Sequence, residues 1–148
     1  MPQSLARNAV HLVFSTKHRE PLIVPSFEAK LHAYMAGTLS ELKCPALEIG
    51  GVADHVHVLF LLARTISMSD AIEELKKSSS RWAKLNGEPR FYWQNGYGAF
   101  SVSASNEAKV QAYIVNQPEH HRKQSFQDEF RMLLKKHGMT WEERYVWD

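Results

Sequence analysis

Apolar side chains fall into two kinds of run along this chain, and each kind predicts a different element. Short apolar or β-branched runs indicate strands, and we expect four, at residues 10–15, 46–51, 54–62 and 99–103. Apolar residues that recur every three or four positions indicate helices with one buried face. We expect these at about 27–42, from a cap at Ser67 or Ser69 to about 85, from about 107 past 113, and at about 127–136. Ser26 is the expected cap of the first helix.

The order of these elements predicts the fold class. Strand, helix, strand, strand, helix and strand match the ferredoxin-like arrangement, an α+β fold whose antiparallel four-stranded sheet carries helices on one face. Two further helices follow, and the first of them carries Tyr113. The expected strand order, 4-1-3-2, places the third strand near the sheet centre. The chain has 148 residues and no repeat, linker or low-complexity tract, so we expect a single domain over residues 1–148.

The third predicted strand carries two histidines, His55 and His57, separated by one valine. Side chains two apart on a strand point to the same face, so both imidazoles project together and can bind one cation. A purely structural strand would carry valine or leucine at both positions, because a buried imidazole needs partners for its ring nitrogens. The alternative is that the two histidines are packed in the core without any metal.

Composition excludes several classes of protein. The single cysteine, Cys44, rules out an intrachain disulfide and a multi-cysteine zinc site, and we expect it to be a small buried apolar group. No apolar run approaches the roughly 20 residues of a membrane span, and the N-terminus does not have the pattern of a signal peptide. We therefore expect a cytoplasmic protein without a membrane partner. The formal net charge of +2 is too small to indicate a nucleic-acid partner by itself.

The helix that begins near residue 107 combines polar groups on one face. Tyr113 and Gln117 are four residues apart and therefore share that face, and Asn116 and His120 lie on or beside it. These groups are more polar than core packing requires. The alternative for Tyr113 is a buried structural tyrosine.

Two motifs in this order resemble the single-tyrosine HUH transposases of small bacterial insertion sequences and their palindrome-associated relatives. His55-Val56-His57 is similar to the His–hydrophobe–His motif of that family, and the segment from Tyr113 to Gln117, followed by His120 and His121, is similar to its tyrosine helix. The segments 11–17 and 93–102 also resemble the family, so the similarity covers about residues 8–136. It implies a transposase that cuts and rejoins single-stranded or hairpin DNA.

The resemblance implies a role for each of the site residues. Tyr113 is the expected nucleophile, which forms a 5′-phosphotyrosine, and His55, His57 and Gln117 are the expected ligands of Mg²⁺ or Mn²⁺. Such an ion can offset the charge of a phosphodiester during in-line attack. Zinc is a weaker candidate because an amide is a poor third ligand. The residues indicate no clear general base, although His120 and His121 are candidates.

Pro118 departs from a regular helix at this point. Proline lacks an N–H and disfavours helical dihedral angles in the residue before it, so the helix can bend or stop at Gln117. If it bends, Glu119 and His121 are the alternative ligands.

Basic and aromatic residues predict where DNA binds, because phosphates need neutralisation and bases need stacking surfaces. The expected DNA-binding residues lie in the loop after the first strand, along the second helix and before the fourth strand, and they are Lys17, Arg19, Lys77, Arg81, Lys84 and Arg90. An ordinary solvated face is the alternative for the second helix.

Two other functions are compatible with these residues. One is a non-catalytic nucleic-acid-binding module on the same fold, and the other is a small metal-dependent hydrolase that uses His55 and His57 without a covalent step. The resemblance favours a homodimer, in which Tyr113 could complete the site of its own subunit or of its partner.

Overall fold

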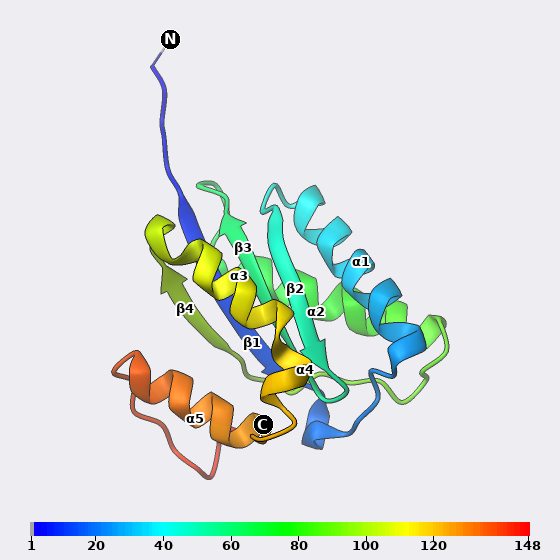
Figure 1. The fold of residues 1–148 in the computed structure, drawn as a ribbon. Coiled ribbons are helices and arrows are strands. Elements are labelled where there is room, and N and C mark those ends of the chain that lie inside the picture. Colours follow the sequence, from blue (N-terminus) through cyan, green and yellow to red (C-terminus); the bar gives the residue numbers. More distant parts are fainter. Residues whose placement is uncertain (1) are drawn as a thin grey trace.

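The computed structural model describes residues 2–148 (Figure 1). The strands are β1 (Asn8–Ser15), β2 (Ala46–Val52), β3 (His55–Leu62) and β4 (Gly98–Val102). The α-helices are α1 (Pro25–Glu41), α2 (Met68–Leu85), α3 (Glu107–Val115), α4 (Gln117–His120) and α5 (Phe126–Lys136). Two short 3-10 helices, η1 (Lys17–Arg19) and η2 (Ala104–Asn106), precede α1 and α3.

The four strands form one antiparallel sheet with the order β2-β3-β1-β4. This confirms the predicted fold class and strand order. The histidine strand β3 is central, between β1 and β2, and His57 lies opposite Val13 of β1. Both neighbours supply ladder hydrogen bonds, so β3 holds its side chains at a well-defined register.

The two faces of the sheet are covered by different helices (Figure 1). Val56, Val58 and Phe60 of β3 face α1 and α2 and belong to the main hydrophobic core. The opposite face is covered by α3, α4 and α5, where Leu59 packs beside Ile114 and Val13 beside Phe130. The ferredoxin-like helices therefore share one face, as predicted, and the added C-terminal helices cover the face onto which His55 and His57 project.

The prediction of the first helix cap was wrong. Helix α1 begins at Pro25, Val24 is its N-cap, and no side chain caps it. Proline suits the first helical position because its fixed φ is already helical and its missing N–H would be unpaired there. Ser67 is the cap of α2 and accepts a hydrogen bond from the backbone N–H of Asp70. Cys44 is buried, as predicted. Among the described residues, no helix has both the length and the apolar composition that a bilayer crossing requires.

Candidate active site

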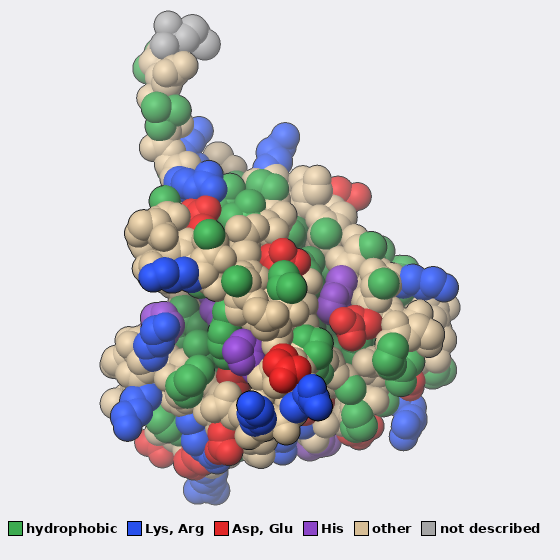
Figure 2. All heavy atoms as spheres, in the orientation of Figure 1, with side chains coloured by type: hydrophobic (Ala, Val, Ile, Leu, Met, Phe, Trp, Pro, Cys, Tyr) green, Lys and Arg blue, Asp and Glu red, His purple; other side chains and the backbone are tan. Residues whose placement is uncertain are grey.

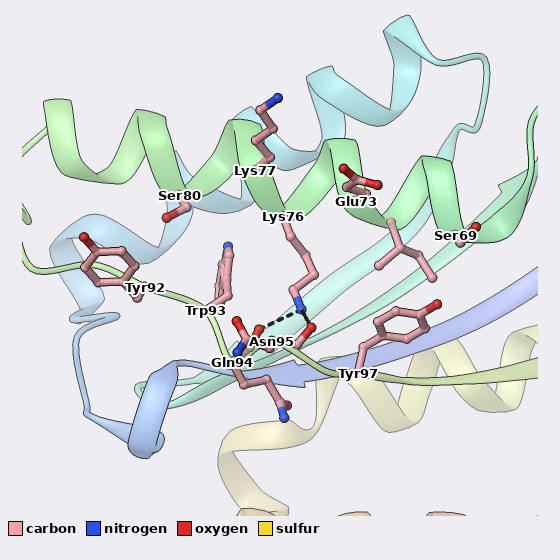
Figure 3. A pocket seen from close by; sticks show the side chains of 11 residues that line it. Ser69, Glu73, Lys76, Lys77, Ser80, Tyr92, Trp93, Gln94, Asn95 and Tyr97 are labelled. Carbon is pink, nitrogen blue, oxygen red and sulfur yellow. Dashed lines mark hydrogen bonds between the residues drawn. The ribbon is translucent and has the colours of Figure 1, made fainter. Parts of the chain in front are cut away.

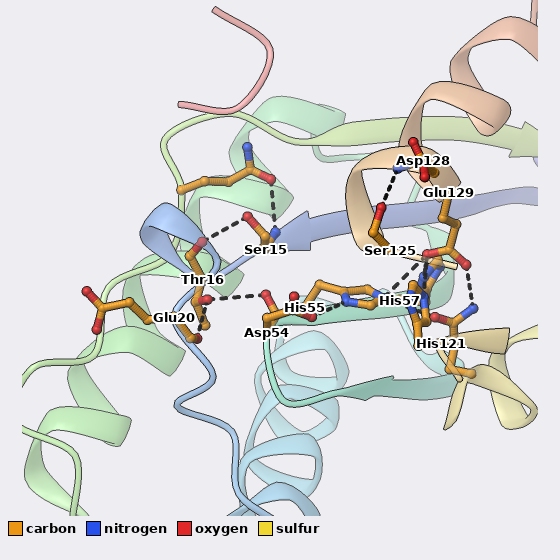
Figure 4. Close-up of polar contacts among 12 residues, drawn as sticks. Ser15, Thr16, Glu20, Asp54, His55, His57, His121, Ser125, Asp128 and Glu129 are labelled. Atoms are coloured by element: carbon orange, nitrogen blue, oxygen red, sulfur yellow. Dashed lines mark hydrogen bonds and ion pairs between the residues drawn. The ribbon is translucent and has the colours of Figure 1, made fainter. Parts of the chain in front are cut away.

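Three imidazoles and one carboxylate converge between the sheet and α5 (Figure 4). The donor atoms of His55, His57, His121 and Glu129 all lie within 4.8 Å of one another. Glu129 Oε1 lies 2.9 Å from Nε2 of His57, 3.0 Å from Nε2 of His121 and 3.3 Å from Nε2 of His55. His55, His57 and Glu129 have no solvent exposure. The carboxylate is therefore fully buried and lies among the three imidazoles.

Local structure explains why these four side chains meet. The period of a strand places His55 and His57 on the same face of β3. Helix α5 buries one side of its length against that face through Phe126 and Phe130, and Glu129 lies on this same buried side. Ser125 is the N-cap of this helix, and its hydroxyl accepts from the N–H of Asp128, so the cap fixes the first turn that carries Glu129.

A second layer of hydrogen bonds orients the two strand histidines. His55 Nδ1 lies 2.7 Å from the carboxylate of Asp54, and His57 Nδ1 lies 2.8 Å from Nε2 of His11. Both contacts occupy the outer ring nitrogen and direct Nε2 toward Glu129. Partners of this kind fix the ring orientation and tautomer of histidine ligands in metal sites.

Tyr113 and Gln117 approach the cluster from the other side. The Tyr113 hydroxyl donates a hydrogen bond to Glu129 Oε2, and the Gln117 side-chain NH₂ donates to the same oxygen over 2.8 Å. The amide oxygen of Gln117 lies 3.0 Å from His55 Nε2. The structure therefore brings together all four residues that the sequence predicted for the catalytic and metal sites, within one chain.

The helix interruption at Pro118 shapes this approach. Helix α3 ends at Val115, and Pro118 lies in the first turn of the short helix α4. Gln117 is nevertheless fully buried at the junction. The change of direction brings His121 into the cluster, as the alternative ligand set anticipated. Glu119 does not join the cluster, because its exposed carboxylate pairs with Arg122 at 3.1 Å.

The surroundings of the cluster shift the pKa values of His55 and His57 in opposite directions. Burial lowers the pKa of His57 to about 4, and the nearby Glu129 offsets this only in part. Burial also lowers the pKa of His55, but hydrogen bonds to Asp54 and Glu129 outweigh it and raise the value to about 9. Burial alone would raise the pKa of Glu129, whereas the three imidazoles hold it far below its usual range. Without a metal ion, Glu129 is thus anionic and His55 carries the proton.

Tyr113 is held in its neutral form by the same surroundings. Burial and the adjacent Glu129 carboxylate both raise the pKa of its phenol well above the ordinary value. His120 stacks on the Tyr113 ring, with 4.6 Å between ring centroids. A phenol in this setting must pass its proton to another group as it reacts, and Glu129 is already hydrogen-bonded to it.

The donor set fits a divalent cation. Three imidazole nitrogens and one carboxylate oxygen lie close enough for one ion to contact all of them. A cation at this point would take over the role that the His55 proton has now, which is to balance the charge of Glu129. Asp54 would keep the proton on His55 Nδ1 and leave Nε2 free to coordinate.

Sequence reasoning missed Glu129 and the partner role of His11. A signal for Glu129 was present, because it is an acidic residue between Phe126 and Phe130 on the apolar side of an amphipathic helix. A charged residue on such a face is rarely buried without a partner. His11 alternates with apolar residues on β1, and only the strand pairing shows that it faces His57.

The residues predicted to bind DNA lie elsewhere on the surface. Lys77 is one of the residues that line a groove between α2 and residues 92–97, in which Lys76 donates to the carbonyls of residues 94, 95 and 96 (Figure 3). The Lys84 ammonium lies 3.9 Å from the centre of the Tyr92 ring. The remaining predicted residues lie on α2, in η1 and in the loop before β4, and they are Arg81, Lys17, Arg19 and Arg90. None of the six lines the cleft that contains Tyr113.

Comparison with known proteins gives the family. The model of the family described as "Transposase IS200 like" matches residues 4–117. A solved candidate transposase from Deinococcus radiodurans R1 is 22% identical, with a TM-score of 0.64 over 79% of this chain and 98% of that one. A REP-associated tyrosine transposase bound to a REP hairpin is 13% identical, with a TM-score of 0.61 over 82% of this chain and 73% of that one. No curated protein matches significantly. At these identities the two structures establish the fold, whereas the family match spans most of the sequence. The chain therefore belongs to the IS200-like transposase family, and it is a transposase.

Proposed function

We propose that this transposase cuts and rejoins single-stranded DNA through a covalent bond between Tyr113 and the 5′-phosphate at the cut. One observation carries the proposal. The Tyr113 hydroxyl donates to the carboxylate that also contacts three imidazoles, so a nucleophile and a set of metal ligands share one group. This combination suits phosphodiester chemistry, in which a hydroxyl attacks a phosphate whose charge is offset by a cation.

The proposed cofactor is Mn²⁺ or Mg²⁺, held by His55 and His57 together with Gln117, His121 or Glu129. The ion would supply positive charge at the non-bridging oxygens of the phosphate. Imidazole ligands favour transition metals, and carboxylates suit Mg²⁺ and Mn²⁺ alike. The presence of His121 and Glu129 therefore favours Mn²⁺ over Mg²⁺. It also makes Zn²⁺ a stronger competitor than it would be with an amide as the third ligand.

The proposed role of Glu129 is to orient the phenol through the hydrogen bond that it accepts from the Tyr113 hydroxyl. As the Tyr113 oxygen forms a bond to phosphorus, its proton passes to water, and the bond from phosphorus to the 3′-oxygen breaks. The departing 3′-oxygen takes up a proton from water. The phosphotyrosine conserves the energy of the broken bond, so a 3′-hydroxyl from another strand can attack it and rejoin the DNA without ATP.

The proposed DNA partner is a single-stranded or hairpin substrate. A similar fold has been solved with a REP hairpin bound, which supports a folded single strand as the substrate class. Lys17, Arg19 and the cationic face of α2 are the proposed contacts for the part of the DNA away from the cut. Lys17 and Arg19 lie in η1, and both η1 and α2 are outside the active site.

A trapping experiment tests the proposed chemistry. Denatured DNA fragments of the source genome, labelled at the 3′ end, are mixed with protein in Mn²⁺ or in EDTA and separated on a denaturing gel. We expect a labelled protein–DNA adduct only with the ion, because a 5′-phosphotyrosine keeps the labelled fragment attached. The Tyr113→Phe variant should form no adduct. Tyr145→Phe is the matched control, since Tyr145 is 61% exposed and lies outside the cluster.

The outcomes separate the competing functions. An adduct that persists in Tyr113→Phe shows that another residue is the nucleophile. Ion-dependent cleavage without any adduct indicates a hydrolase that uses the histidines alone. DNA binding without cleavage by the parent protein indicates a non-catalytic module, in which Glu129 and the histidines serve only to pack α5 against the sheet.

A further inference from the structure

A second cleft opens beside Tyr113, between α3 and α5. Its volume is about 440 Å³, and its floor is formed by β1 and β4. The polar residues that line it include His11, Asn106, Lys109, Tyr113, Lys136 and His137. This volume is in the lower part of the range of about 300–1,000 Å³ that binding pockets for small ligands have. In Figure 2, cationic and histidine side chains border the hollow between these two helices.

The lysine side chains that line this cleft give it positive charge, and no acidic side chain among the lining residues offsets it. Lys109 on α3 and Lys136 on α5 are exposed and form no ion pair with any described residue. His137 stacks on Phe100, with 4.4 Å between ring centroids, so its ring is held against the cleft wall. Two unpaired ammonium groups on opposite walls are complementary to a phosphate backbone.

The groove beside α2 is a weaker site for a phosphate. Its central ammonium, Lys76, is already engaged by three backbone carbonyls at 2.7–3.0 Å, and Glu73 contributes a negative charge to the lining. The cleft between α3 and α5 is also the one that includes the proposed nucleophile.

We propose that the cleft between α3 and α5 binds the nucleotide joined to the scissile phosphate, with Lys109 and Lys136 against the neighbouring backbone phosphates. The inference rests on the proposed function, because it takes Tyr113 as the point of attack. A DNA single strand that is bound at α2, on the opposite face of the sheet, must still reach Tyr113. The cleft gives that strand a cationic path to the phenol, and its dimensions suit an unpaired nucleotide.

The test measures binding without chemistry. A fluorescent dT12 oligonucleotide is titrated with protein in EDTA at 50–200 mM salt, and affinity is read by anisotropy. The Lys109→Gln/Lys136→Gln variant should bind about five- to tenfold more weakly at the lower salt, and the slope of log K against log salt should decrease by about 1.4, because each single-strand phosphate contact contributes about 0.7. Both lysines are exposed on helices, where glutamine is a good helix former.

The matched control removes the same charge elsewhere. Lys30 and Arg64 are exposed and do not line the cleft, so Lys30→Gln/Arg64→Gln should change the affinity less than twofold. Equal weakening by both double variants, or parental affinity in Lys109→Gln/Lys136→Gln, would overturn the proposal. The outcome is independent of the adduct assay, because EDTA removes the divalent metal ion from the titration. If the parent forms no adduct but the cleft variant binds poorly, the cleft binds DNA and the proposed chemistry fails.

Discussion

At the residue scale, the chemistry of the site depends on one carboxylate. Glu129 contacts three imidazoles, the phenol of Tyr113 and the amide of Gln117 from a position with no solvent exposure. A buried carboxylate of this kind is costly unless every oxygen is paired. Here the pairing groups are the same ones that a metal ion would use. The protein can therefore keep the cluster ordered without the ion and still present ligands to it.

Replacing Glu129 tests this dual role. Glu129→Gln should weaken Mn²⁺ binding by about 10- to 100-fold, since the charge and one ligand oxygen are lost. Isothermal titration calorimetry measures the affinity. Glu119→Gln removes the same charge from an exposed position that was a ligand candidate on sequence, and it should leave the affinity unchanged. If Glu119→Gln weakened Mn²⁺ binding and Glu129→Gln did not, the metal ligand would be Glu119 and not Glu129.

A half-buried histidine far from the site predicts part of the pH dependence of stability. His32 on α1 has no hydrogen-bond partner for Nε2 among the described residues, and burial lowers the pKa of the ring to about 4. The unfolded chain binds this proton near pH 6.5, so the stability contribution is lost as pH falls from 6.5 toward 4. Between pH 6.5 and pH 5 this amounts to about 1–2 kcal/mol.

The variant His32→Leu should remove that loss. Its free energy of unfolding should fall less between pH 7 and pH 5 than that of the parent, by about 1–2 kcal/mol. Urea denaturation in EDTA at the two pH values gives both numbers, and contributions from other groups cancel in the comparison. Identical pH dependence in the two proteins would show that His32 is accessible to water in the folded state.

At the element scale, the position of Tyr113 depends on how closely α3 approaches the sheet. Gly50 of β2 lies under this helix, and a Cβ there would meet the backbone oxygen of Ile114 at 2.7 Å. Ile114 directly follows Tyr113, so the glycine sets the height of Tyr113 above the histidine strand. At Gly98 of β4, an added Cβ would instead meet the side-chain ring of Phe130, which directly follows Glu129. Helices α3 and α5, which carry Tyr113 and Glu129, therefore both pack beside a glycine of the sheet.

Filling the contact at Gly50 should displace Tyr113, the proposed nucleophile. Gly50→Ala is expected to lower the free energy of unfolding by about 1–3 kcal/mol, because the methyl group meets backbone that cannot rotate away. It should also reduce the yield of the covalent adduct. Gly37→Ala is the control, because Gly37 lies in α1 with nothing within 4 Å of its added Cβ, and it should be neutral or stabilise by up to about 1 kcal/mol. Thermal melts and the trapping gel compare the two. Equal stability and equal adduct yield in the two variants would mean that α3 can shift without affecting the fold or the reaction.

At the scale of the whole molecule, the structure assembles the site within one chain. Tyr113, the strand histidines and Glu129 meet without a partner subunit. The helices that were added to the ferredoxin-like core close the face that the histidines occupy, and they also form the cleft in which Tyr113 lies. The predicted homodimer therefore needs a reason other than completing this cluster, and pairing of two cuts on one DNA element is such a reason.

Sedimentation velocity at the concentration of the trapping assay tests the dimer. The mass of one chain is 17.0 kDa, and we expect a species of twice this mass in the fraction that forms the adduct. A mixture of Tyr113→Phe protein and a His57→Ala variant adds a second readout. If sites are assembled only within a chain, the mixture should stay inactive, whereas activity in the mixture would show that Tyr113 reaches a partner's histidines. An active species that sediments only as a monomer would contradict the predicted dimer.

The local patterns of the chain determined the elements and half of the site. Strand periodicity alone places His55 and His57 on one face, helical spacing alone pairs Tyr113 with Gln117, and the order of strands and helices indicates the sheet topology. These features depend on neighbours within a few residues, so the sequence contains them. Glu129 and His11 entered the site only through the tertiary structure, which also decided that His121, an alternative ligand on sequence, joins it while Glu119 does not. These residues lie far apart in the sequence, and the packing of α5 and the pairing of β1 with β3 decide which buried groups must share one charge.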